Sequence, residues 1–231
     1  MSARMTRHSI LFPLLIAVAV ASAAQNPPAP PSPHKPTTAH GATSTSAAKD
    51  SQLYRNTTFG FRYKIPYGWV DRTEEMNAQE PNAQPKAAAE SSAGQVLLAI
   101  FERPPNAPGD TVNSAVVIVT ESASTYPGLK KAEDYLGPLT ELATAKGFKP
   151  EGDPDVIEID KRQLIRADFA KPLGPAKDPT KDNDTLTMHQ STLVLLARGQ
   201  ILSLTFIAGS EDEVDDLIDA LHFVGGKFAA H

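Results

Sequence analysis

The chain of 231 residues contains no cysteine. This absence excludes disulfide frameworks, thiol nucleophiles and zinc sites built on cysteine. It does not prevent folding, because the part from Ser51 onward, about 180 residues, is long enough to bury roughly 70% of its unfolded-chain surface. We therefore expect a core that needs neither disulfide nor metal.

Clustered positive charge is also lacking. The formal net charge is −5, and removal of the first 23 residues with Arg4 and Arg7 makes it −5 − 2 = −7. Phosphate backbones are bound mainly by grouped lysine and arginine side chains. The sequence therefore predicts no nucleic-acid partner.

The common catalytic motifs are missing as well. There is no G-x-S-x-G or H-E-x-x-H motif, and Gly225-Gly226-Lys227 lacks the upstream glycine of a phosphate-binding loop. Of the six histidines, only His189 and His222 lie in the predicted folded region before the tail, which disfavours a Ser-His-Asp triad. We expect a protein that is not an enzyme and has no cofactor.

The N-terminus has the three parts of a secretory signal peptide. A segment with two arginines precedes the apolar run Ile10–Val20, and small residues end at Ala23. The alternative, a membrane anchor, needs roughly 20 apolar residues, and Pro13 interrupts this shorter run. We predict a signal peptide over 1–23, no stable membrane anchor after cleavage, and a periplasmic or secreted protein; without cysteine it is not a lipoprotein.

Residues 24–50 form a low-complexity segment rich in Pro, Ala, Thr and Ser, with six prolines between Pro27 and Pro36. Such a composition cannot bury enough apolar surface to fold. It predicts a disordered linker, either a solvated leader or a ligand for a proline-binding groove. Residues 51–231 are predicted to form a single domain.

The stretch Thr57–Trp69 predicts the first core strand. Its aromatic and aliphatic residues alternate with polar ones at period two: Phe59, Phe61, Tyr63 and Ile65. Pro66 and Gly68 then favour a turn. This turn would bring Trp69 back to the sheet as a core residue, or expose it with Tyr67 as an aromatic contact patch.

The remaining pattern alternates strands, loops and helices. Asp71–Gln95 is predicted to be a long loop and Leu129–Lys146 a helix, kinked or split at Gly137-Pro138, with both halves on one sheet face. Lys171–Asp184 is predicted to be a second loop. The other predicted strands are Val96–Phe101, Ser114–Thr120, Asp155–Asp160, Gln163–Phe169, Thr185–Ala197 and Gln200–Ile207.

A last helix starts at a predicted capping box made by Ser210 and Glu213. Its apolar stripe consists of Val214, Leu217, Ile218 and Leu221, and its outer face of Glu211, Asp212, Asp215, Asp216 and Asp219. The acidic face is either solvated or steers a basic partner. The element order predicts an α+β fold, an antiparallel sheet flanked by helices.

The opening Phe59-Gly60-Phe61-x-Tyr63-x-x-Pro66-x-Gly68-Trp69 resembles the PsbP-like fold, which is shared by PsbP, Mog proteins and bacterial envelope lipoproteins. The Gly199 hairpin and the acidic helix ending Leu221-His222-Phe223 add to the resemblance, which spans Leu53 to Phe223. The long Asp71–Gln95 loop and the missing lipoprotein cysteine depart from it. The family has no common catalytic site, so the resemblance implies an α-β-α sandwich that docks on a protein or envelope assembly.

The alternative function is binding of a small molecule or metal. His189 is the candidate ligand, on the strand face of Ser191 and Leu193, with Asp178, Asp182 and Asp184 as the nearest acids in sequence. That loop lacks the glycine and glutamate of a calcium-binding EF-hand, so no metal site is predicted there. His222 is expected to follow the last helical turn, where a cation meets carbonyl ends.

Overall fold

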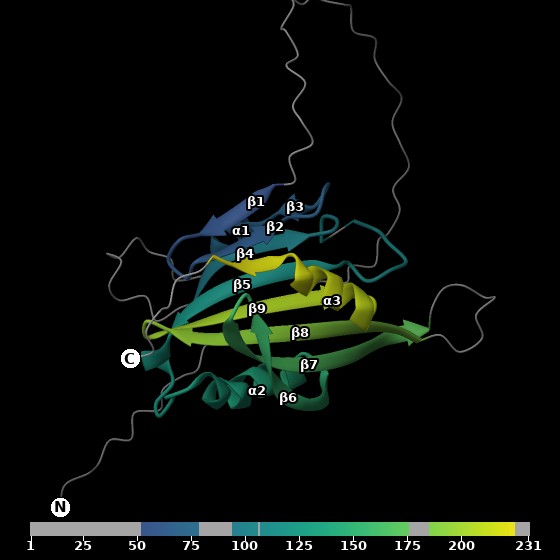
Figure 1. Cartoon of the computed structure of the whole chain (residues 1–231). Helices are drawn as coiled ribbons and strands as arrows, with labels where there is room; N and C mark the ends of the chain where they lie inside the picture. The colour runs from purple at the N-terminus through teal and green to yellow at the C-terminus, as the bar shows by residue number, and fades with distance from the viewer. Residues whose placement is uncertain (1–51, 79–93, 106, 176–184, 225–231) are drawn as a thin grey trace, which may run out of the picture.

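The computed structural model describes residues 52–78, 94–105, 107–175 and 185–224 (Figure 1). The predicted signal peptide 1–23 and linker 24–50 lie outside the described residues, as do the acids Asp178, Asp182 and Asp184. Among the described residues no helix is long and apolar enough to cross a membrane.

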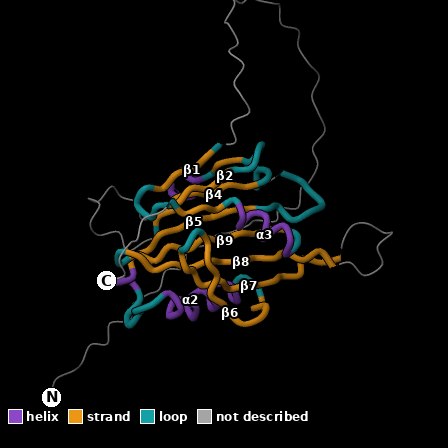
Figure 2. Tube along the Cα trace, in the orientation of Figure 1, coloured by secondary structure: helices purple, strands orange, loops and turns teal. Residues whose placement is uncertain are grey.

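The described part of the chain contains two antiparallel sheets, whose strands are drawn in orange in Figure 2. The larger has the strand order β3-β4-β5-β9-β8-β7-β6, and the smaller has the order β1-β2-β10. The strands are β1 Leu53–Asn56, β2 Phe61–Lys64, β3 Val70–Asp71, β4 Gln95–Phe101, β5 Ala115–Ser122, β6 Lys149–Ile159, β7 Arg162–Pro175, β8 Thr185–Ala197, β9 Gln200–Ala208 and β10 Leu221–Phe223.

Both faces of the larger sheet are covered. The short helix α1, Thr73–Ala78, and the helix α2, Leu136–Ala145, pack on one face. The helix α3, Glu211–Asp219, and the smaller sheet pack on the other face (Figure 1). The prediction of an α+β fold with an antiparallel sheet flanked by helices is confirmed.

This double covering explains the continuous apolar runs in the sequence. Successive side chains of a strand point to opposite faces, and β5 sends Val116 and Ile118 into the core under α3. Val117 and Val119 enter the core on the other face. A strand buried on both sides needs apolar residues at every position.

The predicted opening strand is shorter than expected and is not the first, because β1 precedes it. Residues 57–60 form a turn with Gly60 at φ of 67°, so Phe59 is buried outside the strand, and the alternation holds within β2. Phe61 and Tyr63 of β2 are buried, and the Tyr63 hydroxyl donates a hydrogen bond of 3.0 Å to the Leu217 carbonyl oxygen of α3. Trp69 packs against the same core but is only partly buried. Tyr67 is 88% exposed.

The predicted loop Asp71–Gln95 contains a helix, so this prediction was wrong at its start. The Asp71 carboxylate accepts hydrogen bonds from the backbone N–H and the hydroxyl of Thr73, at 2.9 and 2.6 Å, where α1 begins. Asn77 then bonds to the backbone of Val96, at 2.9 and 3.1 Å, and holds α1 on the sheet. The six-residue helix has no apolar stripe, so periodicity could not reveal it.

The predicted helix 129–146 is divided, but not at its proline. A 3₁₀ turn, η2 Ala132–Tyr135, runs directly into α2. Pro138 lies in the first turn of α2, where a backbone N–H has no partner within the helix and its loss does no harm. A second 3₁₀ turn, η1, spans Ala123–Thr125.

The β6–β7 hairpin is longer than predicted. The β6–β7 turn lies at Asp160 and Lys161, with φ of 48° and 66°, one residue earlier than expected. β7 continues to Pro175 and so enters the predicted loop Lys171–Asp184. The β8–β9 turn lies at Arg198-Gly199, as predicted.

The last helix ends earlier than predicted. α3 stops at Asp219, and Leu221 is buried in β10 rather than in the helix. His222 is therefore a strand residue, with Nδ1 3.3 Å from Asp160 Oδ2, and its expected role at the helix end was wrong. The smaller sheet captures these residues because β10 pairs with β2.

Candidate functional site

The described residues contain one group of side chains that could hold a cation. Glu151 of β6, His189 of β8 and Glu211, the first residue of α3, bring three ligand atoms within 4.8 Å of one another. His189 Nδ1 lies 3.4 Å from Glu151 Oε2 and 4.0 Å from Glu211 Oε1. We call these three residues the Glu-His-Glu cluster.

Strand pairing builds two sides of the cluster. In the β6–β7 pair Glu151 lies opposite Asp168, and in the β7–β8 pair Asp168 lies opposite Ser191, two residues from His189. Directly opposed residues project to the same face of a sheet. Glu151 and His189 therefore both point to the α3 side, where Glu211 meets them.

A small pocket of about 140 Å³ opens at this place. Its polar lining includes the cluster and the pair Arg166 and Asp168. Arg166 Nε donates hydrogen bonds to both Asp168 oxygens, at 3.0 and 2.9 Å, and Nη1 lies 2.9 Å from Asp215 Oδ1 of α3. Arg166 thus ties α3 to the sheet.

The positive charge of Arg166 is paired with Asp168 and Asp215. Burial lowers the pKa of the guanidinium, but the hydrogen bonds and negative charges of Asp168 and Asp215 outweigh burial and leave it raised. The carboxylates of Glu151 and Glu211 have no comparable cation among the described residues, apart from a protonated His189.

Two buried polar atoms on the α3 side of β8 lack hydrogen-bond partners in the described part of the chain. They are His189 Nδ1 and Ser191 Oγ, and the Ser191 residue is 0% exposed. An unsatisfied buried polar group costs about 1–3 kcal/mol. The cluster therefore has bonding capacity that the chain itself does not use.

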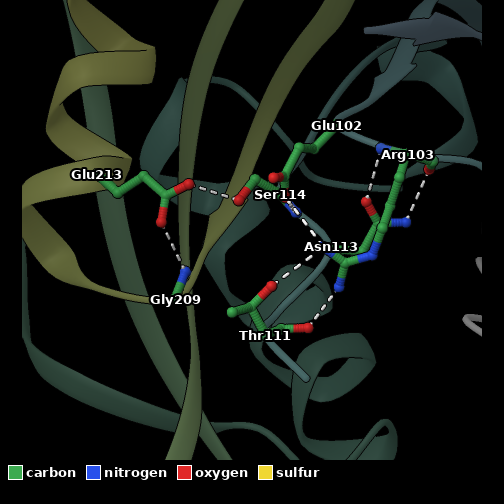
Figure 3. Close-up of polar contacts among 7 residues, drawn as sticks. All are labelled: Glu102, Arg103, Thr111, Asn113, Ser114, Gly209 and Glu213. Atoms are coloured by element: carbon green, nitrogen blue, oxygen red, sulfur yellow. Dashed lines mark hydrogen bonds and ion pairs between the residues drawn. The ribbon is translucent and has the colours of Figure 1, made fainter. Parts of the chain in front are cut away.

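A polar network holds the start of α3 (Figure 3). Glu211 is the first residue of this helix. Glu213 Oε1 accepts from the Ser114 hydroxyl at 2.6 Å, and Oε2 accepts from the Gly209 N–H at 3.2 Å. Ser210 Oγ accepts from the Glu213 N–H at 3.2 Å. Only this half of the predicted capping box forms, because the Glu213 carboxylate reaches Ser114 and Gly209 instead of the Ser210 N–H.

The network continues along the β4–β5 connection in Figure 3. Asn113 bonds to both the N–H and the carbonyl oxygen of Arg103, at 3.1 and 2.9 Å. The Arg103 guanidinium contacts Glu102 and Thr111. These bonds brace the connection from which Ser114 reaches Glu213.

Three aspartates on the outer face of α3 have no partner among the described residues. Asp212, Asp216 and Asp219 are exposed, and within the described residues none of the three makes an ion pair or hydrogen bond. Their neighbour Asp215 differs, because Arg166 binds it. We call these three residues the Asp row.

A larger hollow, of about 640 Å³, lies along the exposed side of α2 and has no such chemistry. All of its lining residues belong to this one helix, and Glu141 is the only ionisable residue among them. It is an open surface rather than an enclosed site.

Sequence reasoning placed His189 on the face of Ser191 and Leu193, and the sheet register confirms this. It missed Glu151 and Glu211 as neighbours of His189. They are distant in sequence, and no local pattern indicates their approach. His222 lies with Asp160, outside the cluster.

No protein-family model matches the chain, and no curated protein matches it. The structure is similar to the solution structure of cyanobacterial PsbP (CyanoP) from Synechocystis sp. PCC 6803, with 14% identity and a TM-score of 0.45, over 80% of this chain and 98% of that one. It is also similar to LpqN, involved in cell envelope biogenesis of Mycobacterium tuberculosis, with 13% identity and a TM-score of 0.34, over 75% and 90% of the two chains. Both likenesses are distant and concern the fold alone.

Proposed function

We propose that the chain is an exported accessory module, without catalytic activity, that docks on a protein or envelope assembly through the exposed face of α3. The partner surface would be basic. The Asp row carries this proposal, because it is a regular, rigidly held set of charges that no described residue neutralises. Export rests on the predicted signal peptide 1–23.

The spacing of the row supports binding. Asp212, Asp216 and Asp219 stand at i, i+4 and i+7, so they share one side of the helix, and like charges at such spacing destabilise it by a few tenths of a kcal/mol per pair. An approaching basic surface relieves that repulsion. Long-range attraction between the Asp row and a basic partner also raises the rate of association.

The helix is already fixed before a partner arrives. The Glu213 bonds hold its first turn, Arg166 holds its middle, and Val214, Leu217 and Ile218 are buried beneath it. A partner therefore loses little binding free energy to ordering of this surface.

A second candidate is ligand binding, favoured by the Glu-His-Glu cluster. Pockets for small organic molecules have volumes of about 300–1,000 Å³, and the pocket here, about 140 Å³, is smaller. The site therefore suits an ion better than a metabolite.

The docking proposal is tested by native mass spectrometry of the full chain, purified gently from the envelope fraction of its own host. We expect a protein-sized added mass that dissociates as salt is raised, since salt screens exposed charges. The variant D212K/D216K/D219K should lose the added mass.

The matched control is E133K/E141K/D153K, which changes the charge equally at exposed acids outside α3. It should keep the partner. Docking through α3 is wrong if the two triple variants bind equally, and docking itself is wrong if the natural chain carries no protein mass.

A further inference from the structure

We propose that Glu151, His189 and Glu211 bind one divalent transition-metal ion, with Zn²⁺ as the ion that fits best. This inference goes beyond docking through α3 and does not depend on it, because the Asp row contributes no ligand to the cluster.

The donor set has the right chemistry. One imidazole nitrogen and two carboxylate oxygens are ligands that Zn²⁺ takes in proteins, with a fourth position left for water or another ligand. Imidazole nitrogen favours transition metals over calcium and magnesium, which prefer oxygen ligands alone.

The distances between the ligand atoms are close to those in a tetrahedral zinc site. Ligands about 2.1 Å from a tetrahedral ion lie about 3.4 Å from one another. The separation of His189 Nδ1 and Glu151 Oε2 is 3.4 Å, and that of Nδ1 and Glu211 Oε1 is 4.0 Å. The Glu211 side chain is 75% exposed, so it is free to rotate inward and close the remaining gap.

The surroundings of His189 Nδ1 also support a metal site. Nδ1 is buried, lies within reach of both carboxylates, and makes no hydrogen bond in the described part of the chain. An imidazole nitrogen that faces two carboxylates and makes no hydrogen bond is placed as a metal ligand would be. The two carboxylates repel one another until a cation separates them.

Arg166 does not supply that cation. Its Nε is bonded to Asp168 of β7 and its Nη1 lies against Asp215 of α3, so its charge is already paired with two other carboxylates. The competing interpretation is a protonated His189 that forms ion pairs with both glutamates. In that case added metal would find no site.

The test uses the full exported chain, freed of metal with a chelator and titrated with Zn²⁺ alone by calorimetry and native mass spectrometry. We expect one Zn²⁺ per chain at this site and a higher melting temperature, because an ion that binds only the folded state stabilises it. E151Q and H189N should each weaken binding by more than about 10-fold, since even outer-shell changes have effects of this size.

E211Q should weaken Zn²⁺ binding to the same extent. Because Glu211 is exposed and lies outside the core, this variant should fold normally, so its loss of binding cannot be attributed to misfolding. The matched controls are H222N and E141Q, a histidine and a glutamate outside the cluster. They should bind Zn²⁺ as the natural chain does.

Three results would overturn the proposal. The first is that the natural chain binds no more Zn²⁺ than the E211Q variant does. The second is equal binding by H222N and H189N, which would place the metal on other histidines. The third is Ca²⁺ binding that H189N does not alter, which would indicate a carboxylate site without the imidazole.

Discussion

At the scale of single residues, Glu213 joins three parts of the chain. Its backbone N–H is capped by Ser210, and its carboxylate accepts from Gly209 and from Ser114 on the β4–β5 side. The Ser114 residue is 1% exposed, so its hydroxyl depends on this one partner. The cap of α3 is therefore a tertiary contact as well as a local one.

We predict that E213A lowers the free energy of unfolding by about 1–2 kcal/mol, because the buried Ser114 hydroxyl loses its acceptor. The Gly209 N–H loses its acceptor too, whereas the Ser210 cap stays, since it binds the backbone N–H of residue 213. D212A removes a neighbouring acid that makes no bond and should change it by less than about 0.5 kcal/mol. Urea unfolding of both variants measures the difference. Equal losses would show that the Glu213 contacts do not stabilise the fold.

At the scale of elements, the hairpin turns depend on residues with positive φ. Gly199 in the β8–β9 turn has φ of 69°, and a Cβ there would contact nothing. Gly137 in α2 is equally open but lacks a positive φ. Since neither site is crowded, substitution of the two glycines by alanine compares a position with positive φ with one without it.

We predict that G199A destabilises the chain by about 1 kcal/mol, because alanine is strained in the left-handed region. G137A should be neutral or stabilise by up to about 1 kcal/mol, since alanine favours helix. Thermal and urea unfolding of both variants test this. A G199A variant as stable as the natural chain would contradict the required turn geometry.

At the scale of the whole molecule, the buried Tyr63 and Tyr135 and the half-buried Tyr126 occupy the two sides of the larger sheet. Tyr63 lies under α3, while Tyr126 and Tyr135 share the carboxylate of Glu121 on the α2 side. Burial raises the pKa of Tyr63. Burial first, then the charge of Glu121, raises the pKa of Tyr135, and burial also raises that of Tyr126.

The direction of these pKa shifts sets a pH limit for the fold. Below pH of about 10, the pKa of tyrosine in an unfolded chain, both states hold the protons and stability is unaffected. Above it the unfolded state releases protons that the folded state keeps, so the free energy of unfolding falls as pH rises.

We predict that stability declines from about pH 10 upward and that tyrosinate absorbance increases together with unfolding. Y135F should decline less steeply, because one titrating group is removed. Y67F, which changes an exposed ring, serves as the control. Chemical unfolding at several pH values measures the slopes, and parallel slopes for Y135F and the natural chain would disprove this role.

Local patterns in the sequence determined the α+β class, most strands and the buried stripe of the last helix. The alternation of Phe61 and Tyr63 and the helical spacing of Val214, Leu217 and Ile218 are confirmed by burial. These features follow from neighbours within a few residues, and strand and helix periods record them directly.

Only the tertiary structure decided where the elements end and which polar groups meet. Pairing with β2 took Leu221 and His222 out of the helix, and Asp71 started a helix without an apolar stripe. The Glu-His-Glu cluster depends on the register of β6, β7 and β8 and on the position of α3 on the sheet. Register and packing are set by long-range burial, so contacts between residues this far apart leave no trace in local spacing.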